Sequence, residues 1–198
     1  MGIEKNRLDR LLELLKDKQR SRVLDIGCRT GYWCHRLSEI GHDPYGVEVR
    51  KEAVRVAREK YPQLHFEVGN CQEKIPFDDK FFDIVWAGDV IEHIAFTDTF
   101  VNEINRVLRI DGLFILTTPM HNRLKNILIS ICNFERHFDP EFAHLRFYTL
   151  KSLRNVLEKR GFRTKSVKYL GRIKPVAKSM CVIAEKVEDK QVYSKHRY

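Results

Sequence analysis

Residues 23–33 read VLDIGCRTGYW, and this stretch decides the fold of the chain. It starts as a short apolar run, turns through Gly27 and Gly31, and continues into a helical pattern at Trp33 and Leu37. The pattern predicts a strand, a tight glycine turn and the start of a helix. Such a turn directs backbone N–H groups and a helix N-terminus towards a ligand above the end of the strand.

The composition is that of an ordinary globular chain. Its 198 residues are 43% hydrophobic and 32% charged, which predicts one domain with enough core to fold unaided. No apolar run approaches the roughly 18 residues of a membrane span, and the N-terminus lacks the apolar core of a secretion signal. The five cysteines form no Cys-x-x-Cys pair, which favours reduced thiols without a zinc site. We therefore expect a cytoplasmic protein with no membrane span.

The charge is distributed unevenly along the chain. Residues 151–198 contain 14 Lys and Arg against 4 Asp and Glu, a net charge of +10, whereas residues 1–150 carry a net charge of −1. Such asymmetry can mark a nucleic acid, an acidic lipid or an anionic substrate. Because the charges are scattered, a solvated basic surface is favoured over a nucleic-acid footprint.

Apolar runs and amphipathic segments alternate along the first 120 residues. Strands are expected at 22–26, 44–49, 64–68, 82–87 and 112–118, and helices at 4–17, 33–40, 50–61 and 97–108. The alternation predicts an α/β fold with a parallel sheet and helices on both faces. A helix at 150–160 and a closing hairpin from 167–170 and 180–184 follow.

We expect one domain over residues 1–185. Within it, residues 120–148 interrupt the alternation after the fifth strand and are expected to form a lid over the substrate pocket. Residues 186–198 are polar and are expected to form a disordered tail.

Three kinds of glycine loop bind nucleotides or nucleosides, and their residue requirements differ. A P-loop needs a Gly-Lys-Ser/Thr ending, which is missing after Gly31. A dinucleotide loop needs Gly-x-Gly-x-x-Gly, and the spacing of Gly27 and Gly31 does not match it. The third kind, Asp-x-Gly-x-x-x-Gly, holds a nucleoside without phosphate. Asp25 favours this third kind, because a carboxylate attracts the ammonium of an amino acid and repels a pyrophosphate.

The chain here resembles class I S-adenosylmethionine-dependent methyltransferases, in particular their small-molecule (ubiquinone-type, methyltransferase type 11) subgroup. The resemblance covers residues 20–185 and rests on several motifs in order. These are residues 24–31, Glu48, Gly69-Asn70-Cys71, the run from Ile75 to Val85, residues 89–94, residues 103–113 and His144 to Thr149. It implies a Rossmann-like sheet of seven strands that is mostly parallel, with the last strand antiparallel.

The resemblance also implies the cofactor, S-adenosylmethionine, which leaves as S-adenosylhomocysteine. Glu48 would accept both ribose hydroxyls, and Asn70 would line the adenine in place of a common aspartate. Arg29 replaces a glycine of the loop, at a cost of about 1 kcal/mol if the site needs a positive φ. The residues expected to bind the cofactor are Asp25, Gly27, Cys28, Gly31, Glu48, Val49, Asn70, Cys71 and Asp89.

Methyl transfer from a sulfonium needs alignment for in-line displacement, and an oxygen acceptor must also lose its proton. His93 is the best candidate base, with Glu92 beside it, because the resemblance places the acceptor just beyond the fourth strand. The alternative is a structural histidine that hydrogen-bonds Glu92. We expect O-methylation of a small molecule.

The resemblance also suggests where a metal ion could bind. Asp89, Glu92 and His93 match the acidic-x-x-Glu-His cluster of ubiquinone-type O-methyltransferases, in which a divalent cation assists a catechol. Two or three candidate ligands alone seldom define a site, so no metal is expected here.

Residues 120–148 are rich in aromatic side chains, which suits a hydrophobic or aromatic methyl acceptor. The candidate acceptor-binding residues are His121, His144, Arg146 and Tyr148. Apolar residues of this segment could equally pack against the sheet.

Two other functions stay open. The basic C-terminal region keeps an RNA or protein methyltransferase in view, although Ala87-Gly88-Asp89-Val90 stands where enzymes that methylate base amines usually carry Asp/Asn-Pro-Pro-Tyr/Phe. A non-catalytic module that binds S-adenosylmethionine is the other alternative. The sequence does not indicate an oligomeric state.

Overall fold

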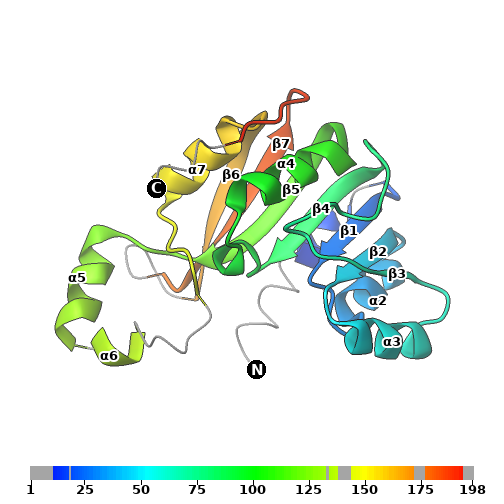
Figure 1. Ribbon diagram of the computed structural model, residues 1–198, viewed down its shortest axis with the longest axis horizontal. Coiled ribbons are helices and arrows are strands. Elements are labelled where there is room, and N and C mark those ends of the chain that lie inside the picture. Colours follow the sequence, from blue (N-terminus) through cyan, green and yellow to red (C-terminus); the bar gives the residue numbers. More distant parts are fainter. Residues whose placement is uncertain (1–10, 18, 133, 138–143, 172–176, 194–198) are drawn as a thin grey trace.

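Seven strands form one mixed sheet (Figure 1). The computed structural model describes residues 11–17, 19–132, 134–137, 144–171 and 177–193. The strand order is β3-β2-β1-β4-β5-β7-β6. The strands are β1 (Arg22–Ile26), β2 (Asp43–Glu48), β3 (His65–Val68), β4 (Phe82–Gly88), β5 (Leu108–Pro119), β6 (Phe162–Leu170) and β7 (Ser179–Lys186). β1 to β5 are parallel, and β7 runs antiparallel to both of its neighbours. The predicted fold class is confirmed.

Helices cover both faces of this sheet, as the alternating pattern predicts. α4 (Thr97–Val107) and α7 (Leu150–Glu158) pack on one face, where Phe100 and Leu153 join Val85 of β4 in one core. α2 (Tyr32–Glu39) and the residues around Leu11 pack on the other face against Trp86. α3 (Lys51–Lys60) completes this second layer over β2 and β3. Both faces of β4 are therefore buried, which explains its continuous apolar run.

Two strands are longer than their apolar runs. β5 begins at Leu108 and β6 at Phe162, whereas the sequence predicts strands only from 112 and 167. The missed part of β6 alternates Arg163 and Lys165 with half-buried residues, so it carries no apolar run. It is nevertheless a strand because β7 supplies its hydrogen-bond partners, with Phe162 opposite Lys186.

Residues 187–193, part of the segment expected to form a tail, run along α4. The Asn102 amide of α4 donates to the Val192 carbonyl oxygen at 3.2 Å and accepts from its N–H at 3.1 Å. Asn105 similarly donates to the Glu188 carbonyl oxygen at 3.0 Å. Two buried amides therefore hold this polar segment along α4. Residues 194–198 lie outside the described part of the chain.

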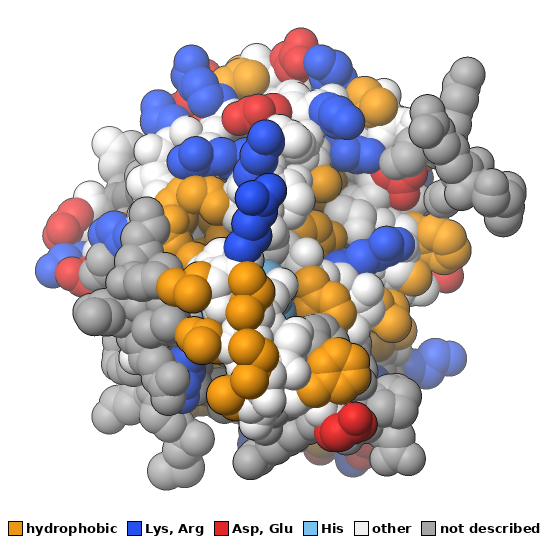
Figure 2. Space-filling model, turned by 90° about the vertical axis from the view of Figure 1, so that its left-hand side faces the viewer, with side chains coloured by type: hydrophobic (Ala, Val, Ile, Leu, Met, Phe, Trp, Pro, Cys, Tyr) orange, Lys and Arg blue, Asp and Glu red, His pale blue; other side chains and the backbone are white. Residues whose placement is uncertain are grey.

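α5 (Arg123–Cys132) and α6 (Phe134–His137) project from the body of the domain beyond β5 (Figure 1). None of the α5 side chains is buried. Figure 2 looks onto this side of the molecule and shows apolar side chains gathered on it. α5 therefore does not pack against the sheet. None of the described helices combines the length and the apolar character needed to cross a bilayer.

Candidate active site

The glycine turn after β1 forms with three residues at positive φ. Gly27, Arg29 and Gly31 have φ values of 75°, 50° and 79°. A Cβ atom on Gly31 would lie 2.6 Å from the ring of Phe66, so only glycine fits there. Arg29 adopts the left-handed conformation without being glycine, and its N–H compensates by donating to Glu48 Oε2 at 3.1 Å.

A cavity of about 270 Å³ opens above this turn, at the carboxyl ends of β1 and β4 and the N-terminus of α2. In parallel sheets this is where ligands bind. Four of the predicted cofactor residues line it, namely Asp25, Gly27, Cys28 and Asp89. Sequence reasoning missed the other lining residues as ligand contacts, which are Ile26, Arg29, Thr30, Tyr32, Trp33, Trp86 and Gly88. The rings of Trp33 and Trp86 stack with centroids 5.1 Å apart.

Asp25 lies at the base of the cavity with 4% of its surface exposed. Burial raises the pKa of its carboxyl group to about 7, and the Glu48 carboxylate adds to this, whereas the Cys34 thiol and Arg29 oppose it. The Cys34 sulfur lies 3.7 Å from Asp25 Oδ2. A cationic ligand beside Asp25 would favour the carboxylate form, so the site is suited to an ammonium group.

Glu48 ends β2 and is 6% exposed. Its Oε2 accepts from the Arg29 N–H, and its Oε1 accepts from the N–H and Nε of Arg50 at 3.1 and 3.2 Å. A carboxylate has about four acceptor sites, so about one is left for a ligand hydroxyl. The next residue, Val49, is 60% exposed.

The predicted adenine-side residues lie on the loop after β3, outside the lining of the cavity. Asn70 Oδ1 accepts from the Gln72 N–H at 3.0 Å, and its amide donates to Glu73. The adenine contact of Asn70 therefore stays a prediction. Cys71 is half-buried, and burial raises the pKa of its thiol to about 11, which keeps it neutral.

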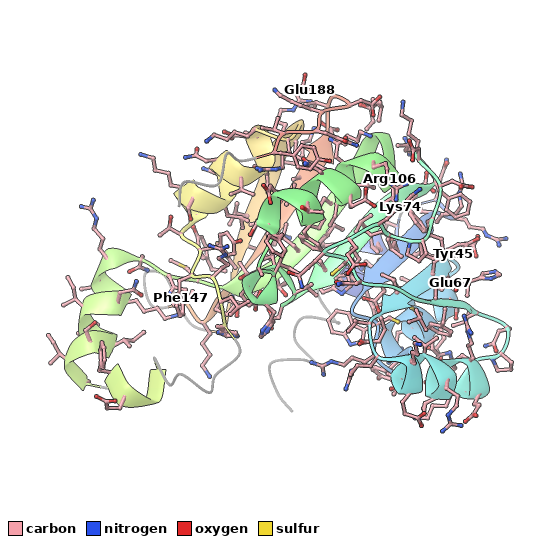
Figure 3. All side chains as sticks on the ribbon, viewed as in Figure 1. Tyr45, Glu67, Lys74, Arg106, Phe147 and Glu188 are labelled. Atoms are coloured by element: carbon pink, nitrogen blue, oxygen red, sulfur yellow. The ribbon has the colours of Figure 1, made fainter. Side chains whose placement is uncertain are left out.

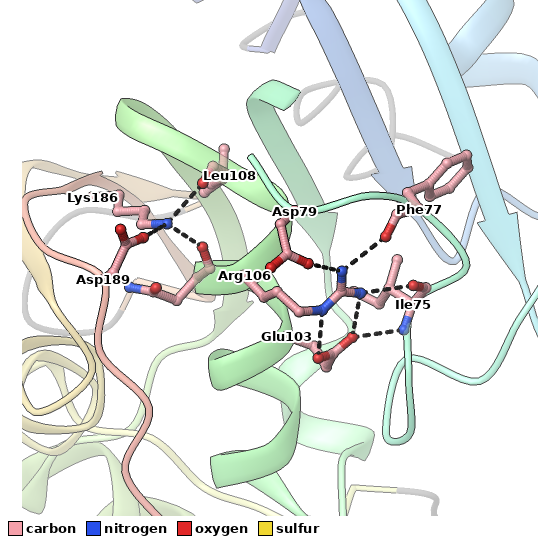
Figure 4. A network of polar contacts seen from close by, with 9 residues as sticks. Ile75, Phe77, Asp79, Glu103, Arg106, Leu108, Lys186 and Asp189 are labelled. Atoms are coloured by element: carbon pink, nitrogen blue, oxygen red, sulfur yellow. Dashed lines mark hydrogen bonds and ion pairs between the residues drawn. The ribbon is translucent and has the colours of Figure 1, made fainter. Parts of the chain in front are cut away.

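Arg106 of α4 fastens the far part of this loop (Figures 3 and 4). Its guanidinium donates to the carbonyl oxygens of Ile75 and Phe77, each at 2.8 Å. It also pairs with Glu103 and Asp79, and Glu103 accepts from the Ile75 N–H at 2.8 Å. One arginine thus ties the loop that carries Asn70 and Cys71 to the core.

Asp89 follows β4 with a φ of 53°. Its N–H donates to the Thr117 carbonyl oxygen at 3.0 Å, and its Oδ1 accepts from the Thr117 hydroxyl at 2.9 Å. Thr117 holds Asp89 at the edge of the cavity and was not predicted as a site residue. Its place near the carboxyl end of β5, opposite Gly88, is the signal that could have indicated it.

The predicted catalytic pair meets a third side chain. Glu92 and His93 lie on the 3₁₀ turn η1 (Ile91–His93), and His144 joins them so that the three possible ligand atoms lie within 4.8 Å of one another. Glu92 is 1% exposed, whereas His93 is exposed. The N–H groups of Leu145 and Arg146 donate to the Glu92 carbonyl oxygen, which brings His144 to η1. Among the described residues, Asp89 is not part of this group.

The other three candidate acceptor residues have structural contacts. His121 is buried, contacts Asn126 at 3.1 Å, and packs edge-on against Phe147 beside α5 (Figure 3). The Arg146 guanidinium donates to the Ala95 carbonyl oxygen at 2.7 Å. The Tyr148 hydroxyl hydrogen-bonds the Thr97 hydroxyl at 3.0 Å, and burial raises the pKa of the phenol. These contacts fix residues 144–148 against η1.

The fold and the site together define the class of Rossmann-like methyltransferase domains. A sequence family described as a methyltransferase domain matches residues 3–167, and the chain belongs to that family. A solved structure of a SAM-dependent methyltransferase from Methanosarcina mazei aligns over 89% of this chain and 97% of its own, with a TM-score of 0.70 and 19% identity. At that identity, the similarity shows the fold alone.

Two curated relatives carry functional names. One, from Mycolicibacterium smegmatis, is named a probable S-adenosylmethionine-dependent methyltransferase and is 34% identical over 97 residues, 49% of this chain and 37% of the relative. Another, from Bradyrhizobium diazoefficiens, is named a ubiquinone biosynthesis O-methyltransferase and is 31% identical over 103 residues, 51% of this chain and 41% of the relative. The chain thus spans well under half the length of these relatives. S-adenosylmethionine is the cofactor of this class.

Proposed function

We propose that this chain transfers a methyl group from S-adenosylmethionine to an oxygen atom of a small, apolar or aromatic acceptor. The observation that carries the proposal is the cavity in which the glycine turn, the buried Asp25 and the post-β4 residue Asp89 meet. The relatives named for ubiquinone and demethylmenaquinone methylation support a small-molecule acceptor of this kind. The five free cysteines support a cytoplasmic location.

The residues of the site fit this cofactor. Asp25 is suited to its ammonium, the N–H groups of the glycine turn to its carboxylate, and Glu48 to its ribose hydroxyls. Asn70 and Cys71, on the loop after β3, would contact the adenine in this proposal. The bound cofactor supplies an electrophilic methyl group, and the chain supplies alignment.

His93 acts as the general base in this proposal. It is exposed, lies four residues beyond the cavity residue Asp89, and packs near His144 with ring centroids 4.9 Å apart. The buried Glu92 beside it would stabilise the imidazolium that forms when an acceptor hydroxyl loses its proton. His144, together with Glu92, would orient the His93 ring.

The same three side chains support a second mechanism. One carboxylate and two imidazoles within 4.8 Å form a donor set for a divalent cation. A cation held there would lower the pKa of an acceptor hydroxyl directly. In that mechanism His93 is a ligand and not a base.

The cofactor site is tested by calorimetry with S-adenosylhomocysteine. We expect Asp25→Ala and Glu48→Ala each to weaken binding at least about tenfold, because each removes a charged partner. Glu59→Ala, which alters an exposed carboxylate of α3, serves as the matched control. Normal affinity in both site variants, with folding verified by circular dichroism, contradicts the site.

The role of His93 is tested by turnover on a panel of phenols and catechols. We expect His93→Asn to lower kcat about a hundredfold or more while leaving the affinity for S-adenosylhomocysteine unchanged. His65→Asn, on β3, is the control. Loss of wild-type turnover on chelation, restored by Mg²⁺ or Mn²⁺, identifies the metal mechanism instead.

The two alternative functions, an RNA or protein methyltransferase and a non-catalytic binding module, predict different outcomes in these assays. If the acceptor is RNA, its binding affinity should fall steeply as the salt concentration rises, because contacts to phosphates release counterions. A binding module would retain affinity without turnover on any acceptor.

A further inference from the structure

The α5 helix turns its apolar side towards solvent. Leu124, Ile127, Leu128 and Ile131 follow the spacing i, i+3, i+4, i+7, which places them on one stripe. In a helix packed on a core this stripe would be buried. Here the four side chains are 50%, 57%, 47% and 76% exposed.

The polar side of α5 faces the body of the domain. Lys125 Nζ donates to the carbonyl oxygens of Met120 at 2.6 Å and Ala177 at 3.3 Å. Asn126 Oδ1 contacts His121 Nδ1 at 3.1 Å. These contacts fix the rotation of the helix about its axis. The outward apolar stripe is therefore set by the polar side chains on the opposite side.

Neighbouring residues enlarge this apolar surface. Phe134 of α6, Leu145 and Phe147 are 52%, 58% and 43% exposed. Seven of the 14 exposed large apolar side chains in the described part of the chain thus lie between residues 124 and 147. Scattered exposed apolar residues are ordinary, whereas a concentration of this kind marks an interaction surface. We call these seven residues the α5 patch.

Most charged side chains around the α5 patch are positive, and the exposed Glu135 of α6 is an acidic exception. Arg123, which precedes the stripe, and Arg146, which stands between Leu145 and Phe147, are exposed. Lys178 is also exposed, and its carbonyl oxygen lies 3.5 Å from Lys125 Nζ of α5. The sequence contains no Asp or Glu from Gly112 to Phe134, and none from Lys159 to Ala184. Figure 2 shows Lys and Arg side chains directly above the apolar ones on this face.

We propose that the α5 patch docks on the surface of an anionic lipid bilayer. An outward apolar helix with flanking cations complements acyl chains and anionic headgroups at the same time. A second copy of the chain is a poorer occupant. In a symmetric dimer the patch would face itself and bring the flanking cations of two chains, each with net charge +9, together.

The test is flotation of the full chain with vesicles. We expect co-flotation with vesicles of equal parts phosphatidylcholine and phosphatidylglycerol, and at least about tenfold weaker binding to phosphatidylcholine alone. The double variant Ile127→Glu, Ile131→Glu should lose binding by about tenfold or more, because it places charges within the apolar stripe. No side chain of α5 is buried, so the variant should fold normally.

The control variant is Ile110→Glu, which alters a 38% exposed apolar residue at the opposite end of β5 and should leave binding intact. Unchanged affinity for S-adenosylhomocysteine in the double variant separates docking from the proposed methyl transfer. The proposal is overturned if the wild-type chain binds neither vesicle, or if the double variant binds as well as the wild type. Light scattering that shows a wild-type dimer dissociated by the double variant, with no vesicle binding, would assign the patch to self-association.

Discussion

At the scale of single residues, Asp25 is a buried carboxyl group whose pKa is raised to about 7. The sequence identifies this residue from its place in the turn, because a carboxylate there argues against a phosphate ligand. Its burial and the proximity of Glu48 were beyond sequence reasoning, since they depend on how β2 and α2 close over the turn. Burying the ionised Asp25 carboxylate destabilises the folded protein.

Asp25 should therefore make the stability of the protein depend on pH. Its pKa of about 7 in the folded state lies above the ordinary value of 3.8, so the folded protein binds this proton more tightly than the unfolded chain does. The free energy of unfolding consequently falls as pH rises from about 4 to about 7. We expect Asp25→Asn to stabilise the protein by on the order of 2–4 kcal/mol at about pH 8, and by little at about pH 4.

Urea titrations of both proteins at the two pH values measure this difference. Glu59→Gln, which changes an exposed carboxylate, should alter stability equally little at both. An equal effect of Asp25→Asn at both pH values would show that Asp25 does not titrate near neutrality in the folded protein.

Arg29 shows what the sequence can and cannot predict about one position. The comparison with a glycine-containing loop indicates a cost of about 1 kcal/mol if the position needs a positive φ, and the φ of 50° shows that it does. The hydrogen bond from its N–H to Glu48 could not be read from the sequence, because it joins residues 19 positions apart.

At the scale of elements, local periodicity predicts strands that are buried on both faces better than strands at an edge. β1 and β4 are mostly apolar, and their predicted bounds agree with the structure within one residue. β6 and the segment 187–193 carry charged and polar residues, and each is ordered by a partner far away in the sequence. Local sequence patterns do not identify partners that lie far away in the chain.

Among single contacts between elements, those of Lys186, the last residue of β7, are expected to contribute most to the free energy of unfolding. It is fully buried, and its Nζ donates to the carbonyl oxygens of Asn105 and Leu108 at 2.5 and 2.8 Å and pairs with Asp189 at 2.7 Å (Figure 4). We expect Lys186→Met to lower the free energy of unfolding by roughly 2–4 kcal/mol, because two buried carbonyl oxygens lose their donor.

Chemical denaturation measures this loss, with Lys190→Met as the matched control. Lys190 pairs with Glu188 where both side chains are exposed, so its replacement should change stability by less than about 0.5 kcal/mol. Equal effects of the two substitutions would show that burial of the Lys186 ammonium contributes nothing to stability.

At the scale of the whole molecule, the site forms where several elements meet. The sequence predicts the order and direction of the strands that meet there, but not the contacts between side chains. The parallel order of β1, β2 and β4 places Asp25, Glu48 and Asp89 at one edge of the sheet, as the sequence implies. The approach of His144 to His93 depends on the path of the chain after α6, which no local pattern specifies. The outward orientation of α5 was not predicted either: the sequence favoured a lid over the substrate pocket, with packing against the sheet as the alternative.

Hydrogen exchange should reveal these differences in packing across the molecule. We expect the slowest amides in β4 and β5, which are buried between two layers, and fast exchange along α5, which buries no side chain. Mass spectrometry of exchanged peptides checks this order. Protection of residues 123–132 equal to that of β4, in lipid-free buffer, would mean that α5 is already packed against protein.

The position of β7 between β5 and β6 has a consequence for how the protein is made. On a ribosome, β5 is synthesised some 60 residues before the strand that covers its open edge. Until residues 179–186 emerge, Phe114 and Leu116 lie in a strand whose outer hydrogen-bonding groups have no partner. The nascent chain therefore passes through a stage in which the sheet is incomplete and prone to aggregation. Chaperone binding is most important during this stage. Synonymous codons that slow translation between β6 and β7 would lengthen that stage and lower the yield of folded protein.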